Sequence, residues 1–165
     1  MRPSPPSLSD ADRQVARDFA TVVKEVQPRL RQAFVARYGI DVGLDATAAA
    51  LGWAWEHRCE TLTLSNPVGY LFRVGQSSTR SHFAWTRRRS AGFPPEQSSR
   101  DVTSSVDLAD AVARLGTNQR LCVLLIHAHG WSYREVADLL AISVDAVTNH
   151  VHRGLKRLRQ LLEDE

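Results

Sequence analysis

The stretch SYREVADLLAISVDAVTNHVHRGLKRL, residues 132–158, carries the strongest structural signal in the chain. Ser132 and Glu135 stand three residues apart, which is the spacing of a capping box at the start of a helix. Aliphatic residues on one face continue this short helix, and residues 141–143 then turn the chain. A second helix is predicted from Val144. Its inward face is expected to carry Val147, Val151, Leu155, Leu158 and Leu162.

Two helices joined by so short a turn are typical of a helix-turn-helix, whose second helix enters the major groove of DNA. Asn149 suits an adenine edge, whereas Thr148 and the arginines equally suit phosphates. A plain αα-hairpin is the alternative interpretation. The predicted DNA-binding residues of this recognition helix are Asp145, Ala146, Thr148, Asn149, His152, Arg153, Lys156 and Arg157.

Residues 108–130, which precede the helix-turn-helix, are predicted to form two more helices. The first has an apolar face that is closed by Gly116, and Thr117 is expected to cap the second. The second of these helices is almost wholly apolar, so it must be buried on most sides. The predicted C-terminal unit, residues 107–165, therefore has four helices and ends in the helix-turn-helix.

The N-terminal part predicts a second helical unit over residues 9–89. Its first helix begins with a capping residue at Ser9 and runs to Gly39, with Pro28 permitting a kink or a fresh start. A second helix fits residues 44–58, and a third begins at Asn66-Pro67, where proline occupies the first helical position.

The remaining segments do not suit a packed core. Residues 1–8 are rich in proline and serine and predict a disordered lead-in. Residues 90–106 have the glycine, proline and serine content of a flexible linker. No strand-like alternation of useful length occurs, so the fold class is all-α, with two small helical domains joined by a linker.

The composition is that of a globular protein, and its positive charge is local. Of the 165 residues 43% are hydrophobic, the formal net charge is +3, and arginine supplies 19 of the 21 basic residues. Residues 66–100 carry six basic side chains against one acidic, and a second basic cluster lies at residues 153–159. Arginine suits phosphate and base contacts, so these clusters fit a nucleic-acid partner, and they fit a pair of ordinary solvated helix faces equally well.

Other classes of protein find little support in the sequence. No apolar run reaches membrane-spanning length and no secretory leader is evident, so we expect a cytoplasmic protein without a membrane partner. Cys59 and Cys122 lack the spacing of a zinc site, and the histidine pairs at 127/129 and 150/152 point to different helix faces. Neither a glycine-rich phosphate loop nor an activated nucleophile is present. We therefore expect no enzymatic activity, metal or cofactor.

The helix predicted from Asn66 mixes arginine with aromatic residues. Tyr70, Phe72 and Trp85 alternate with basic side chains, a composition that suits single strands or flipped bases, since cations hold phosphates and rings stack on bases. Taken alone, this pattern is more typical of a core helix with one solvent-exposed side than of a helix that binds nucleic acid. The basic run Arg87, Arg88 and Arg89 is expected to hold phosphates.

Two long segments resemble one family. NPVGYLFRVGQSSTRSHFAWTRRR, residues 66–89, is similar to the end of the sigma-two domain of extracytoplasmic-function (ECF) sigma factors. LADAVARLGTNQRLCVLLIHAHGWSYREVADLLAISVDAVTNHVHRGLKRLRQLL, residues 108–162, is similar to their sigma-four domain, and this second match is the more specific. The resemblance extends back through PRLRQAFVARYG and GLDATAAALGWAWEH, and the segments stand in the family's order.

The resemblance implies a transcription initiation subunit. Its sigma-two domain would bind core RNA polymerase and open the minus-ten element, and its sigma-four domain would read the minus-thirty-five element, so promoter DNA would be bound double-stranded and melted. The positions that match minus-ten contacts are Arg73, Ser77, Arg80, Ser81 and His82. Asp45 and Leu51 match the polymerase-binding helix, and Trp55 is expected to cover the polymerase-facing surface or to pack in the core. Many relatives are held inactive by an anti-sigma factor, which is therefore a candidate partner.

The chain departs from the family's pattern at several polar positions. Ala48 stands for a usual Gln, Gln76 and Ser77 for a usual Arg-Asn, and Ala146 for a usual Thr. These departures motivate an alternative, in which a sigma-like adaptor binds polymerase without melting promoters. A regulator with a LuxR-type helix-turn-helix is a further alternative, although such regulators usually carry a receiver or ligand-binding domain. The two helical units can also fold against each other and hide both basic clusters.

Overall fold

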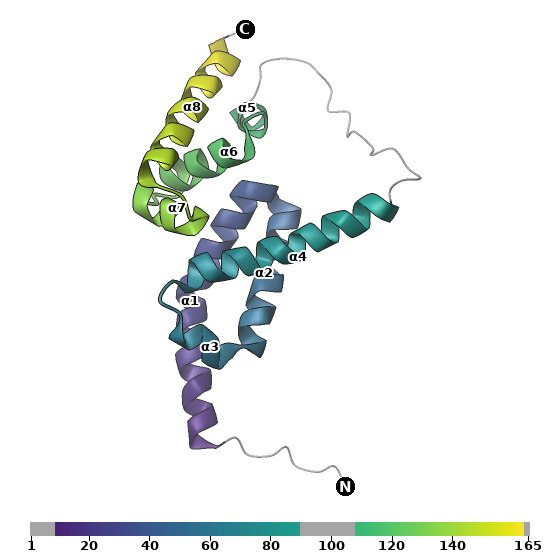
Figure 1. Cartoon of the computed structure of the whole chain (residues 1–165), viewed down its shortest axis with the longest axis vertical. Helices are drawn as coiled ribbons and strands as arrows, with labels where there is room; N and C mark the ends of the chain where they lie inside the picture. Colours follow the sequence, from purple (N-terminus) through teal and green to yellow (C-terminus); the bar gives the residue numbers. More distant parts are fainter. Residues whose placement is uncertain (1–8, 90–107, 164–165) are drawn as a thin grey trace.

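The computed structural model describes residues 9–89 and 108–163, and all secondary structure in these ranges is helical, as predicted (Figure 1). The N-terminal bundle consists of α1 (Asp10–Tyr38), α2 (Ile40–Glu56), α3 (Arg58–Thr63) and α4 (Pro67–Arg89). The C-terminal bundle consists of α5 (Leu108–Ala113), α6 (Thr117–Val123), the π-helical segment η2 (Leu124–Ala128), α7 (Tyr133–Leu140) and α8 (Val144–Glu163). The predicted lead-in at 1–8 and linker at 90–106 lie outside the described residues.

The ends of the N-terminal helices follow local signals. The Ser9 hydroxyl accepts a hydrogen bond from the Asp12 amide at 3.2 Å, which confirms Ser9 as the N-cap, and the Asp12 carboxylate accepts one from the Ser9 amide at 3.3 Å, which completes a capping box. Pro28 lies inside α1 without ending it. Gly39, at φ +85°, ends α1 and begins α2, so α2 starts four residues earlier than predicted.

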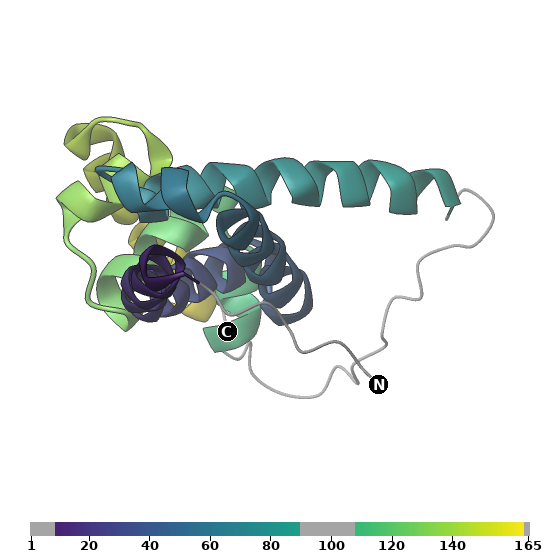
Figure 2. The ribbon, with the colours of Figure 1, turned by 90° about the horizontal axis from the view of Figure 1, so that it is seen from below.

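The loop before α4 contains an additional short helix that the sequence analysis did not predict. This helix, α3, is held by the buried Thr61, whose hydroxyl donates to the His57 carbonyl at 3.0 Å. α4 begins at Pro67 as predicted, and the Asn66 side-chain oxygen accepts from the Gly69 amide at 2.9 Å. In Figures 1 and 2 the C-terminal half of α4 projects beyond the other helices.

In the C-terminal bundle, the N-cap of α6 and the inward face of α8 differ from the predictions. Gly116, not Thr117, is the N-cap of α6, and it makes no side-chain cap. On α8 the inward face carries Val147, Val151 and Leu158, as predicted, but Leu155 is 39% exposed and Leu162 is 42% exposed. Gly154 takes the inward position, because a Cβ there would lie 2.8 Å from Val123 Cγ2.

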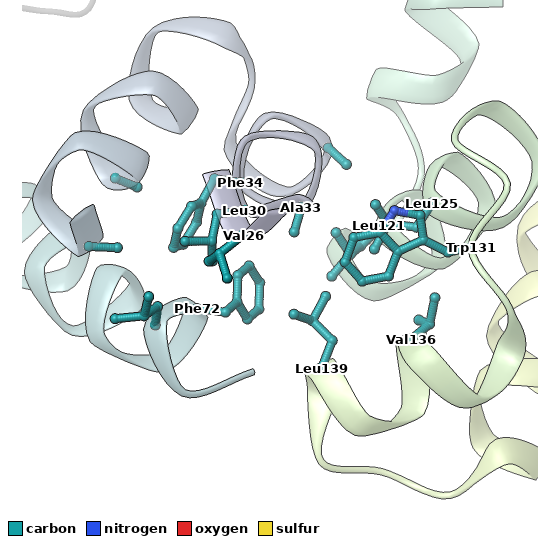
Figure 3. Close-up of a cluster of buried hydrophobic side chains, with 14 of the residues drawn as sticks. Val26, Leu30, Ala33, Phe34, Phe72, Leu121, Leu125, Trp131, Val136 and Leu139 are labelled. Carbon is teal, nitrogen blue, oxygen red and sulfur yellow. The ribbon is translucent and has the colours of Figure 1, made fainter. Parts of the chain in front are cut away.

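One continuous apolar core joins the two bundles (Figure 3). In the N-terminal bundle Phe34 is fully buried, and its ring centre lies 4.8 Å from that of Phe72. Leu139 of α7 points from the C-terminal bundle toward this pair, with Trp131 and Val136 behind it. The bundles therefore share a core as well as a surface.

Candidate nucleic-acid interface

The helix-turn-helix has the local geometry that its sequence predicts. The Ser132 hydroxyl accepts from the Glu135 amide at 3.2 Å, and the Glu135 carboxylate accepts from the Ser132 amide at 2.8 Å, which confirms the capping box of α7. Ala141 turns the chain in the left-handed conformation, at φ 55°. The Ser143 hydroxyl then accepts from the Ala146 amide at 3.1 Å and caps α8. These local bonds fix the direction in which α8 leaves the turn.

The outward face of α8 holds all of the predicted recognition-helix residues. Val147 and Val151 are buried, and the polar and basic side chains are turned away from them. Ala146 is half-buried, and the exposed residues are Asp145, Thr148, Asn149, His152, Arg153, Lys156 and Arg157. The Thr148 hydroxyl donates to the Val144 carbonyl at 3.0 Å, so in this geometry it offers DNA an acceptor and not a donor for phosphate.

The predicted minus-ten residues lie along α4. Arg73 and Ser77 are exposed in its first half. The backbone of the second half is helical, but the side chains of Arg80, Ser81, His82, Arg87, Arg88 and Arg89 lie outside the described ones. Phe72 is fully buried against Phe34 and is excluded as a stacking platform for bases, whereas Tyr70 is half-buried, 5.3 Å from the Trp53 ring centre.

The outer face of α2 is apolar, and its inner face is built from small residues. Gly43, Ala46, Thr47, Ala50 and Ala54 are buried. Large side chains face outward at spacings of four and seven residues: Ile40 is 60% exposed, Leu44 41%, and Trp55 58%, with Leu51 half-buried between Leu44 and Trp55. We call these four residues the α2 stripe. The predicted Leu51 and Trp55 belong to it, and exposed Asp45 lies beside it.

An ion pair and a tryptophan join α1 to the C-terminal bundle. Arg29 Nη2 lies 2.5 Å from Glu135 Oε1, and the Arg29 guanidinium stacks 4.2 Å from the Trp131 ring centre. Trp131 Nε1 donates to Gln32 Oε1 at 2.8 Å. Glu135 therefore caps α7 and pairs with the other bundle at once.

Arg120 makes a second connection between the bundles, at the C-terminal end of α1. Its Nε donates to the Ala36 carbonyl at 3.1 Å, and its Nη2 donates to the Arg37 carbonyl at 2.6 Å. These carbonyls belong to the last turn of α1, which carries the negative end of the helix dipole. Arg120 thus provides both hydrogen bonds and charge to a helix end of the other bundle.

Sequence reasoning did not identify the α1 contacts with the C-terminal bundle. Arg29 and Glu135 are 106 positions apart, so no local periodicity pairs them. The α2 stripe was identified only in part, because Ile40 precedes the predicted start of that helix. A sequence signal for Ile40 and Leu44 did exist: with Leu51 and Trp55 they repeat at helical spacing.

Acidification is expected to weaken the contact that Glu135 makes. The Ser132 backbone N–H, together with Arg29 and the Ser132 hydroxyl, lowers the pKa of Glu135 from 4.5 to about 2. A folded-state pKa below the unfolded one stabilises the fold above pH 4.5, and this contribution is lost as the pH falls toward about 2. Unfolding of the wild type and Glu135→Gln across this range measures the effect. The stability difference should shrink with falling pH, and a constant difference would contradict the assignment.

The two cysteines are free thiols in different surroundings. Cys59 is exposed, and burial raises the pKa of the Cys122 thiol to about 11. Within residues 9–89 and 108–163, no three His, Cys, Asp or Glu side chains are grouped as metal ligands would be. None of the described helices is both long and apolar enough to cross a membrane.

Comparisons with known proteins find similar sequences. Residues 105–158 match the family model "Sigma-70, region 4". RNA polymerase sigma factor CarQ of Myxococcus xanthus is 33% identical over 81 residues, 48% of this chain and 47% of CarQ, so the chain spans about half the length of this relative. ECF RNA polymerase sigma factor SigL of Mycobacterium tuberculosis is 28% identical over 136 residues, 73% of this chain and 74% of SigL.

Two solved structures share the fold. The sigma factor RpoE, in complex with the anti-sigma factor NepR from Bartonella quintana, aligns with a TM-score of 0.63 and 24% identity, over 89% of this chain and 98% of RpoE. CnrH, in complex with the cytosolic domain of CnrY, aligns with a TM-score of 0.57 and 22% identity, over 94% of this chain and 99% of CnrH. Both alignments therefore include helices of the N-terminal and of the C-terminal bundle.

Proposed function

We propose that the chain is an ECF sigma factor, which binds core RNA polymerase and directs transcription initiation without enzyme chemistry of its own. Residues 9–89 act as the sigma-two-like domain and residues 107–165 as the sigma-four-like domain. The orientation of α8 supports the proposed function most directly, because the aliphatic side of this helix is buried and its polar and basic side faces outward. This function places the chain in the cytoplasm, with polymerase and DNA.

Each surface has one role in this proposal. The recognition helix α8 reads the minus-thirty-five element as duplex, and Arg73 and Ser77, with the second half of α4, contact the minus-ten element as it melts. The α2 stripe docks on polymerase, because large apolar side chains that are exposed to solvent gain from being covered by a partner. An anti-sigma factor is the regulatory partner that we propose, by analogy with NepR on RpoE.

The packed arrangement cannot contact both promoter elements at once. The two elements are separated by about 25 base pairs, or about 85 Å of duplex at 3.4 Å per base pair. α7, which precedes the recognition helix, packs directly on α4. The bundles must therefore separate when the chain engages a promoter, which breaks the contacts of Arg29, Trp131 and Arg120 with the opposite bundle.

Run-off transcription with purified core polymerase tests the function. The proposal expects a promoter-dependent product that requires this chain. Stable binding to core polymerase without product from any candidate promoter would instead identify a sigma-like adaptor, for which the departures at Ala48, Gln76 and Ser77 provide a reason.

Two alanine substitutions on α8 are expected to have different effects on DNA binding. Asn149→Ala removes a base contact, so it should lower affinity for the cognate element by about 1–3 kcal/mol and relax specificity at one position. Arg157→Ala removes a phosphate contact, so it should weaken binding to all sequences alike and lower the salt slope by about 1. Fluorescence anisotropy over a salt series measures both effects.

Binding to core polymerase is the control for both variants. Binding to core polymerase should be unchanged in both, because α8 and the α2 stripe belong to different bundles. Equal loss of DNA and polymerase binding would indicate misfolding. An unchanged salt slope for Arg157→Ala would reject the phosphate contact.

A further inference from the structure

A cavity of about 240 Å³ lies at the boundary between the two bundles, and two arginines line it. Arg37 comes from the end of α1 and Arg73 from α4. Gln76 and Asn118 add amide groups, and residues 139–142 of α7 and the following turn supply the rest of the wall. Among the described residues no carboxylate lines this cavity, so the described lining carries two positive charges and no negative one.

The charge of these arginines is not neutralised within the described chain. Arg37 Nη1 donates to Asn118 Oδ1 at 3.4 Å, but Arg37 Nε is buried and has no acceptor among the described residues. Neither Arg37 nor Arg73 forms an ion pair in those ranges. Two like charges that line one cavity without a carboxylate partner repel each other, so an anion between them is favourable.

We propose that the cavity binds a small phosphate-bearing anion. Guanidinium groups match phosphate oxygens in geometry, and two of them balance a dianion, whereas a monocarboxylate would leave one charge unpaired. Because Asn118 Oδ1 accepts from Arg37, its amino group remains as a third donor. The volume is below the roughly 300–1,000 Å³ of sites for drug-sized ligands, so inorganic phosphate or pyrophosphate suits it better than a whole nucleotide.

The ligand would hold the packed arrangement together. Its arginine partners belong to the N-terminal bundle, and Asn118 and residues 139–142 belong to the C-terminal bundle. Bound anion would also occupy Arg73, which the proposed function assigns to the minus-ten strand. The inference thus goes beyond the proposed function, and binding is measurable without DNA or polymerase.

Isothermal titration of the full chain with sodium phosphate and with sodium pyrophosphate, at constant ionic strength, tests the site. We expect saturable binding of one anion per chain. Arg37→Gln and Arg73→Gln should each raise Kd at least tenfold, and Asn118→Ala, which keeps both charges, should raise it severalfold. Arg31→Gln is the matched control, since Arg31 is an exposed arginine of α1 that does not line the cavity.

Circular dichroism and thermal unfolding without anion establish that each variant folds. Absence of saturable binding to the wild type would overturn the proposal. So would an equal effect of Arg31→Gln and Arg37→Gln, because it would identify general attraction of anions to an arginine-rich surface. If the chain fails in run-off transcription but gives the expected titration results, the anion site stands and only the proposed sigma-factor function is rejected. The two proposals can therefore fail independently.

Discussion

Replacing Gly75 by valine is expected to lower the free energy of unfolding by about 3 kcal/mol or more. A Cβ at this position of α4 would lie 2.3 Å from Phe34 Cζ and 2.8 Å from the carbonyl oxygen of Ala46. Phe34 is fully buried, and the Ala46 oxygen belongs to the backbone of α2, so neither can give way without moving a helix. Chemical denaturation followed by circular dichroism measures the loss.

Gly52 offers the matched control on α2. It is also helical, but nothing lies within 4 Å of a Cβ built there. Gly52→Ala should therefore stabilise the chain by about 1 kcal/mol through helix propensity alone. Destabilisation of similar size at both positions would show that close packing is not the reason for glycine at position 75.

The effect of Gly75→Val should extend to function. Gly75 sets the close approach of α4 to α2, and these helices carry the candidate minus-ten residues and the α2 stripe. A wider crossing changes the orientation of one surface relative to the other, although the substituted residue is buried. Run-off transcription should thus fall further than the folded fraction of the variant accounts for.

The helix-turn-helix could be predicted from the sequence because its determinants are local. The capping box at Ser132, the turn at Ala141 and the buried Val147 and Val151 are set by neighbours within a few positions. The prediction failed at Leu155, because the inward position between Val151 and Leu158 is taken by Gly154, which has no apolar side chain to recognise. Leu155 was assigned to that face instead and is exposed.

The contacts between bundles could not be predicted, because they depend on pairs far apart in the chain. Arg29 and Glu135 each fit a solvated helix face when considered alone, and Arg120 gives no sign that it reaches the end of α1. In α2 the small residues are buried, whereas the large side chains of Ile40, Leu44 and Trp55 are exposed. Helix periodicity finds a face, but only tertiary packing decides which face is the core.

Replacing Trp55 by alanine is expected to weaken binding to core polymerase by about 2–4 kcal/mol, or roughly 30- to 1,000-fold. Trp55 is 58% exposed, the second largest exposure in the α2 stripe after Ile40, and its side chain is the largest there. A large aromatic residue in an otherwise apolar exposed stripe has the character of a binding hot spot. Titration of core polymerase with labelled chain measures the loss.

The contact of Trp55 with the core requires a separate control. Its ring meets Phe19 edge-on, with ring centres 5.7 Å apart, so alanine also removes an aromatic pair worth about 0.5–1.5 kcal/mol of stability. Trp55→Phe keeps that pair while reducing the exposed surface, and it should bind polymerase with intermediate affinity. Leu162→Ala truncates a similarly exposed apolar side chain on α8 and should bind core polymerase nearly as the wild type does. Polymerase binding that falls only in proportion to lost stability would show that Trp55 serves the fold and not the partner.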